Sequence, residues 1–137
     1  LGLGATIVTN KRKIEADDFF TGMFETALDP DEIVTKVVFP IPRKAGYSKF
    51  PNPASRYALV GVFVSKRGKE VRAAVTGAGP CVFRSKELEA ALSARFAPKS
   101  LEGVNIPSAG LNSDIHASAD YRANLIAVMA RRAVAAA

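Results

Sequence analysis

The chain has 137 residues, of which 48% are hydrophobic and 23% charged, which is the composition of an ordinary globular protein. These proportions exclude a largely disordered chain, and no apolar run approaches the roughly 20 residues that a membrane-spanning helix needs. The only cysteine, Cys81, excludes an intrachain disulfide and cannot alone hold an iron–sulfur cluster. We therefore expect a reduced core thiol in a cytoplasmic protein.

The net charge of +6 raises the question of nucleic-acid binding. The basic residues are scattered along the chain, however, apart from the clusters at 11–13 and 131–132. The first cluster is typical of a hairpin tip, and the second of the last turns of a helix, where the helix dipole favours cations. A solvated surface, or contact with a partner that has an acidic face, explains this pattern better than nucleic acid.

The first forty residues predict short strands around one helical turn. Residues 5–9 are rich in β-branched side chains and predict a strand, to which residues 12–15 can return. Asp17 and Asp18 precede two phenylalanines and predict the start of a short helix. A stronger strand begins near Asp31 and ends at Pro40, because proline cannot donate to a strand ladder.

The middle of the chain predicts an antiparallel hairpin. Residues 43–46 suggest a turn, and residues 47–50 a short extended segment. Residues 58–64 form a nearly continuous apolar run, which is typical of a strand buried on both faces. A hairpin loop at 66–69 then leads to an antiparallel partner at 71–75.

Two helices are predicted in the C-terminal part, with an irregular stretch at 98–116 between them. Ser85 is a suitable N-cap for a helix through Phe96, and Ser118 for a helix over 119–136. Four residues of the last helix share one face: Tyr121, Leu125, Val128 and Arg132. The order of elements predicts an α+β fold, in which helices cover an antiparallel sheet of about three strands.

The residues by themselves indicate no reaction. His116 is the only histidine, so a zinc site built from several histidines is excluded, and no nucleophile-elbow motif is present. The Gly-x-Gly fragments at 2–4 and 77–79 do not extend to a dinucleotide fingerprint. The adjacent carboxylates at 17–18 and 31–32 are not arranged to share a proton, because neighbouring strand residues point to opposite faces. We predict no catalytic residue and no metal ligand.

Three ordered stretches resemble the medium subunit of the molybdenum hydroxylases of the xanthine dehydrogenase and aerobic carbon monoxide dehydrogenase type. The first comprises Leu3–Thr6 through Arg12, Asp18–Gly22 and Leu28–Val34 with Pro40. The second comprises Tyr47–Phe50 and Tyr57–Val62. The third comprises Ala117–Arg122 with Arg131–Ala133. Together they cover nearly the whole chain.

The resemblance implies that residues 1–43 are the C-terminal remnant of the FAD-binding domain. Residues 44–137 would be the C-terminal domain of the carbon monoxide dehydrogenase flavoprotein type. The chain opens on Leu1 rather than on Met, so we expect a piece of a longer subunit that is inactive alone. In the family, FAD receives electrons from iron–sulfur clusters in a small subunit, which take them from a molybdenum centre in a large subunit. The glycine-rich segments that hold the FAD pyrophosphate would lie upstream of Leu1.

The resemblance also implies three cofactor-binding residues. Val34 matches a position where a backbone group meets FAD, and Lys49 matches a lysine near the flavin or its phosphates. Tyr57 matches a position where some carbon monoxide dehydrogenases place a tyrosine against the isoalloxazine ring. Family members often carry Asp directly before this tyrosine, whereas this chain has Arg56, which leaves the electron acceptor open.

Two other functions remain open at this stage. The C-terminal domain could be a scaffold without a catalytic part, which docks the iron–sulfur subunit and orients the flavin. A basic nucleic-acid-binding module would instead require clustered Lys and Arg on one helix, which the sequence lacks. The substrate is not readable, because the family selects it in the molybdenum subunit.

Overall fold

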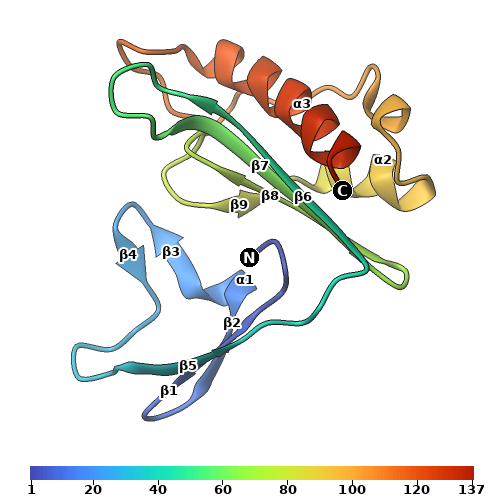
Figure 1. Cartoon of the computed structure of the whole chain (residues 1–137). Coiled ribbons are helices and arrows are strands. Elements are labelled where there is room, and N and C mark those ends of the chain that lie inside the picture. Colours follow the sequence, from blue (N-terminus) through green and yellow to red (C-terminus); the bar gives the residue numbers. More distant parts are fainter.

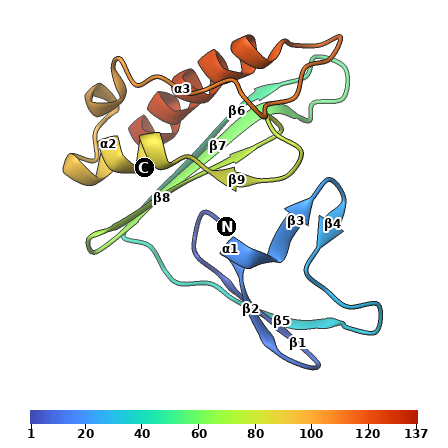
Figure 2. The ribbon, with the colours of Figure 1, turned by 180° about the vertical axis from the view of Figure 1, so that it is seen from behind.

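The computed structural model describes all residues 1–137 and shows two parts joined near residue 43 (Figure 1). The larger part is a four-stranded antiparallel sheet in the order β6-β7-β8-β9. Its strands are β6 (Lys44–Pro51), β7 (Ala58–Arg67), β8 (Glu70–Thr76) and β9 (Phe83–Arg84). Helices α2 (Lys86–Ala94) and α3 (Ala119–Ala135) cover one face, and the N-terminal part lies at the other, as Figure 2 shows from behind. The predicted α+β class is confirmed.

The hydrophobic core lies between this sheet and its helices. On β7, every second side chain points toward α3, and Val60, Val62 and Val64 are fully buried there. They belong to a core cluster of 20 buried residues, to which α3 contributes Ile126 and Met129 among others. The apolar run that predicted β7 therefore marks the centre of the sheet.

Serine caps begin both helices, as the sequence predicted. The hydroxyl of Ser85 accepts a hydrogen bond from the Leu88 amide at 3.4 Å, and that of Ser118 accepts one from the Tyr121 amide at 3.2 Å. A 3₁₀ turn at Pro98–Leu101 is the regular element between the two helices. Of the four residues predicted to share one face of α3, Leu125 is buried, Val128 is half-buried, and Tyr121 and Arg132 are exposed.

Strand β6 is longer than predicted, and the turn predicted at 43–46 is wrong. Lys44, Ala45 and Gly46 pair with Lys66, Ser65 and Val64 on β7. Gly46 lies where α3 comes closest to the sheet, since a Cβ atom there would be 2.0 Å from the Ala133 carbonyl oxygen. Glycine at this position permits close packing of the helix on the strand instead of forming a turn.

The N-terminal part contains a small sheet and a hairpin. Strands β1 (Thr6–Thr9), β2 (Lys13–Glu15) and β5 (Val34–Val38) form the antiparallel order β2-β1-β5. Helix α1 (Ala16–Phe19) leads into the hairpin of β3 (Phe20–Gly22) and β4 (Glu25–Thr26). None of the helices in the chain combines the length and the apolar character that crossing a membrane requires.

A buried carboxylate organises this small sheet. The side chain of Glu32 accepts hydrogen bonds from the Thr9 hydroxyl at 2.6 Å, the Arg12 guanidinium at 3.0 Å and the Asp29 amide at 3.0 Å. The bonds from Arg12, followed by those from Thr9 and Asp29, lower the pKa of Glu32 from 4.5 to about 2. This cluster fixes the 27–33 segment against the β1–β2 hairpin.

The first residues of the chain lie on the sheet face opposite the helices. The Ser65 hydroxyl donates to the Gly2 carbonyl at 2.6 Å, and a Cβ atom on Gly2 would lie 2.4 Å from the ring of Phe63. Gly2 is therefore in close contact with the sheet, which explains why β7 is also buried on this side near Phe63 and Ser65.

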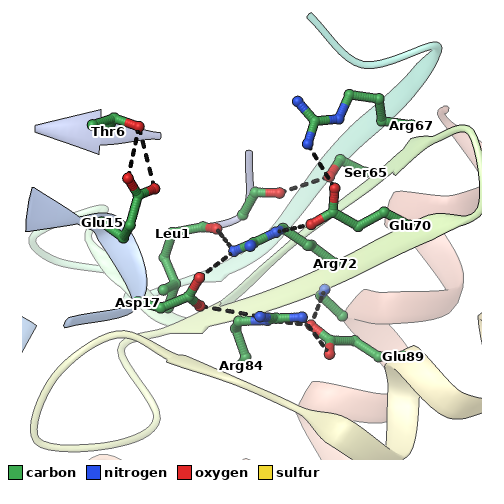
Figure 3. A network of polar contacts seen from close by, with 12 residues as sticks. Leu1, Thr6, Glu15, Asp17, Ser65, Arg67, Glu70, Arg72, Arg84 and Glu89 are labelled. Carbon is green, nitrogen blue, oxygen red and sulfur yellow. Dashed lines mark hydrogen bonds and ion pairs between the residues drawn. The ribbon is translucent and has the colours of Figure 1, made fainter. Parts of the chain in front are cut away.

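Asp17 joins the two parts electrostatically (Figure 3). Its carboxylate accepts hydrogen bonds from Arg72 on β8 at 2.8 Å and from Arg84 on β9 at 3.1 Å. Burial alone would raise the pKa of Asp17, but the bonds from Arg72 and Arg84 outweigh it and lower that pKa. The two arginines also pair with Glu70 and Glu89 respectively, at 2.8 and 2.7 Å. The sequence prediction identified the helix start at Asp17 but not this link to the sheet.

A buried arginine fastens one end of α3. Arg122 is only 3% exposed and donates to the carbonyls of Leu59 at 2.8 Å and Gly77 at 3.1 Å. It also pairs with the Asp114 carboxylate at 2.8 Å. One side chain therefore connects α3, the start of β7, the end of β8 and the 114–117 loop.

Glu32 should make the stability of the fold depend on acid pH. Its folded pKa is lowered from 4.5 to about 2, so its contribution is complete above pH 4.5 and is lost as the pH falls toward 2. We predict that Glu32→Gln lowers stability at neutral pH and flattens this part of the acid-denaturation curve. Urea unfolding at a series of pH values measures both effects. Glu102→Gln, at an exposed position without an ion pair, is the control. Equal pH profiles for the Glu32→Gln variant and the wild type would contradict the prediction.

Arg122→Met should destabilise the fold strongly. Methionine keeps the packing of the apolar stem but leaves the Leu59 and Gly77 carbonyls and the Asp114 carboxylate without their donor. We expect a loss on the order of 2 kcal/mol in the free energy of unfolding, because the Leu59 and Gly77 carbonyls lose their charged donor. Arg132→Met on the same helix is exposed and should change it by less than about 0.5 kcal/mol. Similar urea midpoints for the two variants would argue against the structural role of Arg122.

Candidate functional site

The candidate site begins at the part of the sheet face that neither the helices nor residues 1–4 cover. Side chains on β6 alternate, and those of Ser48 and Phe50 contact α3. Tyr47 and Lys49 consequently point to the opposite face, where both are exposed. This end of β6 therefore presents an aromatic ring and a cation side by side.

Tyr47 pairs with Phe63 on β7, and the end of its ring lies over Gly61, the β7 partner of Lys49. A Cβ atom on Gly61 would be 2.5 Å from the Tyr47 hydroxyl, so only glycine leaves room for this ring position. The Tyr47 side chain is 48% exposed. Tyr47 was not among the predicted site residues, although its spacing of two from Lys49 on a strand places both on one face.

Lys49 and Tyr57 are brought together by the loop between β6 and β7. The Lys49 ammonium donates a hydrogen bond of 2.9 Å to the carbonyl oxygen of Arg56, the residue before Tyr57. The Tyr57 side chain is 80% exposed, so its ring is free to contact another group. Two of the three predicted site residues thus belong to one local structure.

Val34 lies apart from these two residues, at the start of β5 in the small sheet. It is paired with Thr9 on β1, and its side chain is 37% exposed. The residue before it, Ile33, exchanges hydrogen bonds with Asn10, at 2.9 Å through its amide and at 3.1 Å through its carbonyl. In both Figure 1 and Figure 2 the start of β5 and the β6–β7 loop project toward the same side of the molecule.

A groove of about 650 Å³ separates the β3–β4 hairpin from the segment that follows β8. Met23 and Phe24 line it from the hairpin, and Pro80 and Cys81 from the other side. Phe24 is fully exposed and has a positive φ of 59°, which is uncommon for a non-glycine residue. Cys81 is partly exposed here, so its predicted place in the core is wrong. Sequence patterns could not predict this groove, because its two walls come from segments more than fifty residues apart in the chain.

The combined surface is suited to binding. Exposed tyrosine rings can contact a planar group, and the Lys49 cation favours an anionic one. The guanidinium groups of Arg72 and Arg84 are engaged by carboxylates at the junction of the two parts. Lys49 differs from these two arginines: its hydrogen bond goes to the carbonyl of Arg56, and no carboxylate neutralises its charge.

Comparison with known proteins identifies the relatives of this chain. No family model matches it. It is 36% identical, over 93% of its length, to the nicotine 6-hydroxylase medium subunit of Paenarthrobacter nicotinovorans. The match covers 48% of that protein, so the chain spans about half the length of this curated relative.

Solved structures share the fold over nearly the whole chain. Carbon monoxide dehydrogenase from Oligotropha carboxidovorans superposes with a TM-score of 0.80 and 24% identity, over 99% of this chain and 53% of that one. Quinoline 2-oxidoreductase from Pseudomonas putida 86 gives a TM-score of 0.75 and 23% identity, over 98% and 52%. At these identities the structures establish the fold, and the sequence match to a medium subunit agrees with it. The sequence match and the shared fold together make the chain similar to about half of a molybdenum hydroxylase medium subunit.

Proposed function

We propose that this chain is the part of a molybdenum hydroxylase medium subunit that encloses FAD. In this proposal FAD takes electrons from iron–sulfur clusters of a small subunit, which are reduced by the molybdenum centre of a large subunit, and passes them to an acceptor. The observation that supports it most directly is the hydrogen bond from Lys49 to the residue before Tyr57, on an uncovered sheet face. This arrangement occurs in a chain that is 36% identical to a medium subunit.

The residues of this surface fit one side of a flavin. The exposed rings of Tyr57 and Tyr47 would exclude water from a planar ring system, and Lys49 would favour a phosphate or an anionic ring. Val34 would contact the cofactor from the small sheet. The cofactor itself supplies the redox chemistry, and the protein binds and orients it.

The two parts of the chain would belong to different domains of the subunit. We assign residues 1–43 to the FAD-binding domain and residues 44–137 to the C-terminal domain. These 137 residues contain no glycine-rich fingerprint for a pyrophosphate, so a glycine-rich loop that binds it would come from elsewhere in the subunit, with Lys49 as an additional cation. The Asp17–Arg72–Arg84 cluster would then hold the two sides of the cofactor site together.

Tyr57→Ala in the complete subunit tests this proposal. Aromatic stacking contributes about 0.5–1.5 kcal/mol, so we predict FAD affinity to fall roughly two- to thirteenfold and flavin reoxidation to change. Equilibrium dialysis and stopped-flow absorbance measure the two quantities. Tyr121→Ala, which removes a tyrosine on the helix-covered face, is the matched control.

A Tyr57→Ala subunit with unchanged flavin content, spectrum and reoxidation rate would reject the flavin contact. If such a subunit still bound the iron–sulfur subunit in the absence of FAD, the alternative of a docking scaffold would take its place.

A further inference from the structure

The loop that carries Tyr57, residues 52–57, is closed by its own hydrogen bonds. The Asn52 amide donates to the Tyr57 carbonyl at 2.7 Å, and the Arg56 amide donates to the Asn52 carbonyl at 2.9 Å. The Asn52 side-chain oxygen accepts from the amides of Ala54 and Ser55 at 2.9 and 3.2 Å. The 52–57 loop is therefore a compact unit with a defined backbone.

Arg56 has an uncommon backbone conformation within this loop. Its φ of 63° lies in the left-handed region, which a residue with a long side chain occupies only when its surroundings hold it there. In this conformation its carbonyl oxygen accepts the 2.9 Å hydrogen bond from Lys49. Lys49 is firmly placed, since it lies within β6 and pairs with Gly61.

We propose that Lys49 is a positioning residue that sets the direction of Tyr57 by holding the Arg56 carbonyl. The Tyr57 amide is bonded only within the loop, to the Ser55 hydroxyl at 3.4 Å, and its side chain is 80% exposed. The direction of the ring consequently follows from the backbone conformation of Arg56. Lys49 then acts on the cofactor through Tyr57, in addition to any direct effect of its charge; this inference rests on the proposed function.

The two ends of the hydrogen bond can be changed separately. Lys49→Met removes the donor and the charge while keeping the length of the side chain. Arg56→Val leaves Lys49 intact, but a β-branched residue disfavours a positive φ and so turns the carbonyl away. Lys49→Arg keeps a cationic donor, and Arg56→Asn keeps the left-handed preference without the arginine side chain. These two variants are the matched controls.

The experiment uses the complete subunit, first freed of FAD and then loaded with it. Hydrogen–deuterium exchange in the FAD-free protein reports on the amides of Asn52 and Arg56, which close the 52–57 loop. A lost hydrogen bond to a charged group should accelerate their exchange about tenfold or more in both Lys49→Met and Arg56→Val. In the loaded protein, the visible flavin spectrum and the reoxidation rate should change in the same direction in both variants.

The two control variants should behave like the wild type in both measurements. The proposal is overturned if loop exchange is unchanged in Lys49→Met and Arg56→Val. It is also overturned if Lys49→Met alters the flavin spectrum while Arg56→Val does not, because Lys49 would then act by its charge alone. If even the wild-type subunit binds no FAD, the proposed function fails, while the exchange rates still decide whether Lys49 holds the loop.

Discussion

The packing of α3 against the four-stranded sheet is the constraint on which the rest of the structure depends. It buries one face of β7 completely and fixes the register of β6 and β8 beside it. Because strand side chains alternate, burying one face on α3 also decides which residues face away. Tyr47 and Lys49 are directed to the uncovered face by the same packing that places Ser48 and Phe50 against the helix.

Three charged side chains at the edges of this core connect separate elements through hydrogen bonds. Arg122 ties the N-terminal end of α3 to the carbonyls of Leu59 on β7 and of Gly77, the residue after β8. In the N-terminal part, Asp17 connects helix α1 to the large sheet through Arg72. Glu32 connects the segment before β5 to β1 through Thr9, within the small sheet. Each of the three charged side chains has several polar or oppositely charged partners, as ions that are buried, like Arg122 and Glu32, require.

The sequence predicted those features that depend on local pattern. The caps at Ser85 and Ser118, the apolar strand β7 and the short helix at Asp17 all follow from a few neighbouring residues. Gly46 was misread as part of a turn, because the reason for a glycine there is a helix that is almost ninety residues away in the chain. The two-residue strand β9 was also missed, since nothing in its sequence distinguishes it from a loop.

The candidate site likewise contains some features that local sequence indicates and others that depend on loop conformation or on distant residues. Resemblance singled out Lys49 and Tyr57, and their contact through Arg56 could not be predicted, because it requires the left-handed conformation of one loop residue. Tyr47 could have been found from the sequence, because it lies in the extended segment predicted at 47–50, two residues from Lys49 on the same face. The arginine partners of Asp17 come from β8 and β9, so the sequence around Asp17 holds no sign of them.

Strand β5 has a consequence for handling the protein. It is the outer strand of the small sheet, so one of its sides carries backbone groups that no neighbouring strand pairs. Its valines and the following Phe39 and Ile41 are exposed as well, and Lys36 is the single charge within the strand. Long, apolar, unpaired edges are templates on which further strands assemble. The exposed edge of β5 is therefore a place where copies of these 137 residues can associate, and a second charge on this strand would oppose that.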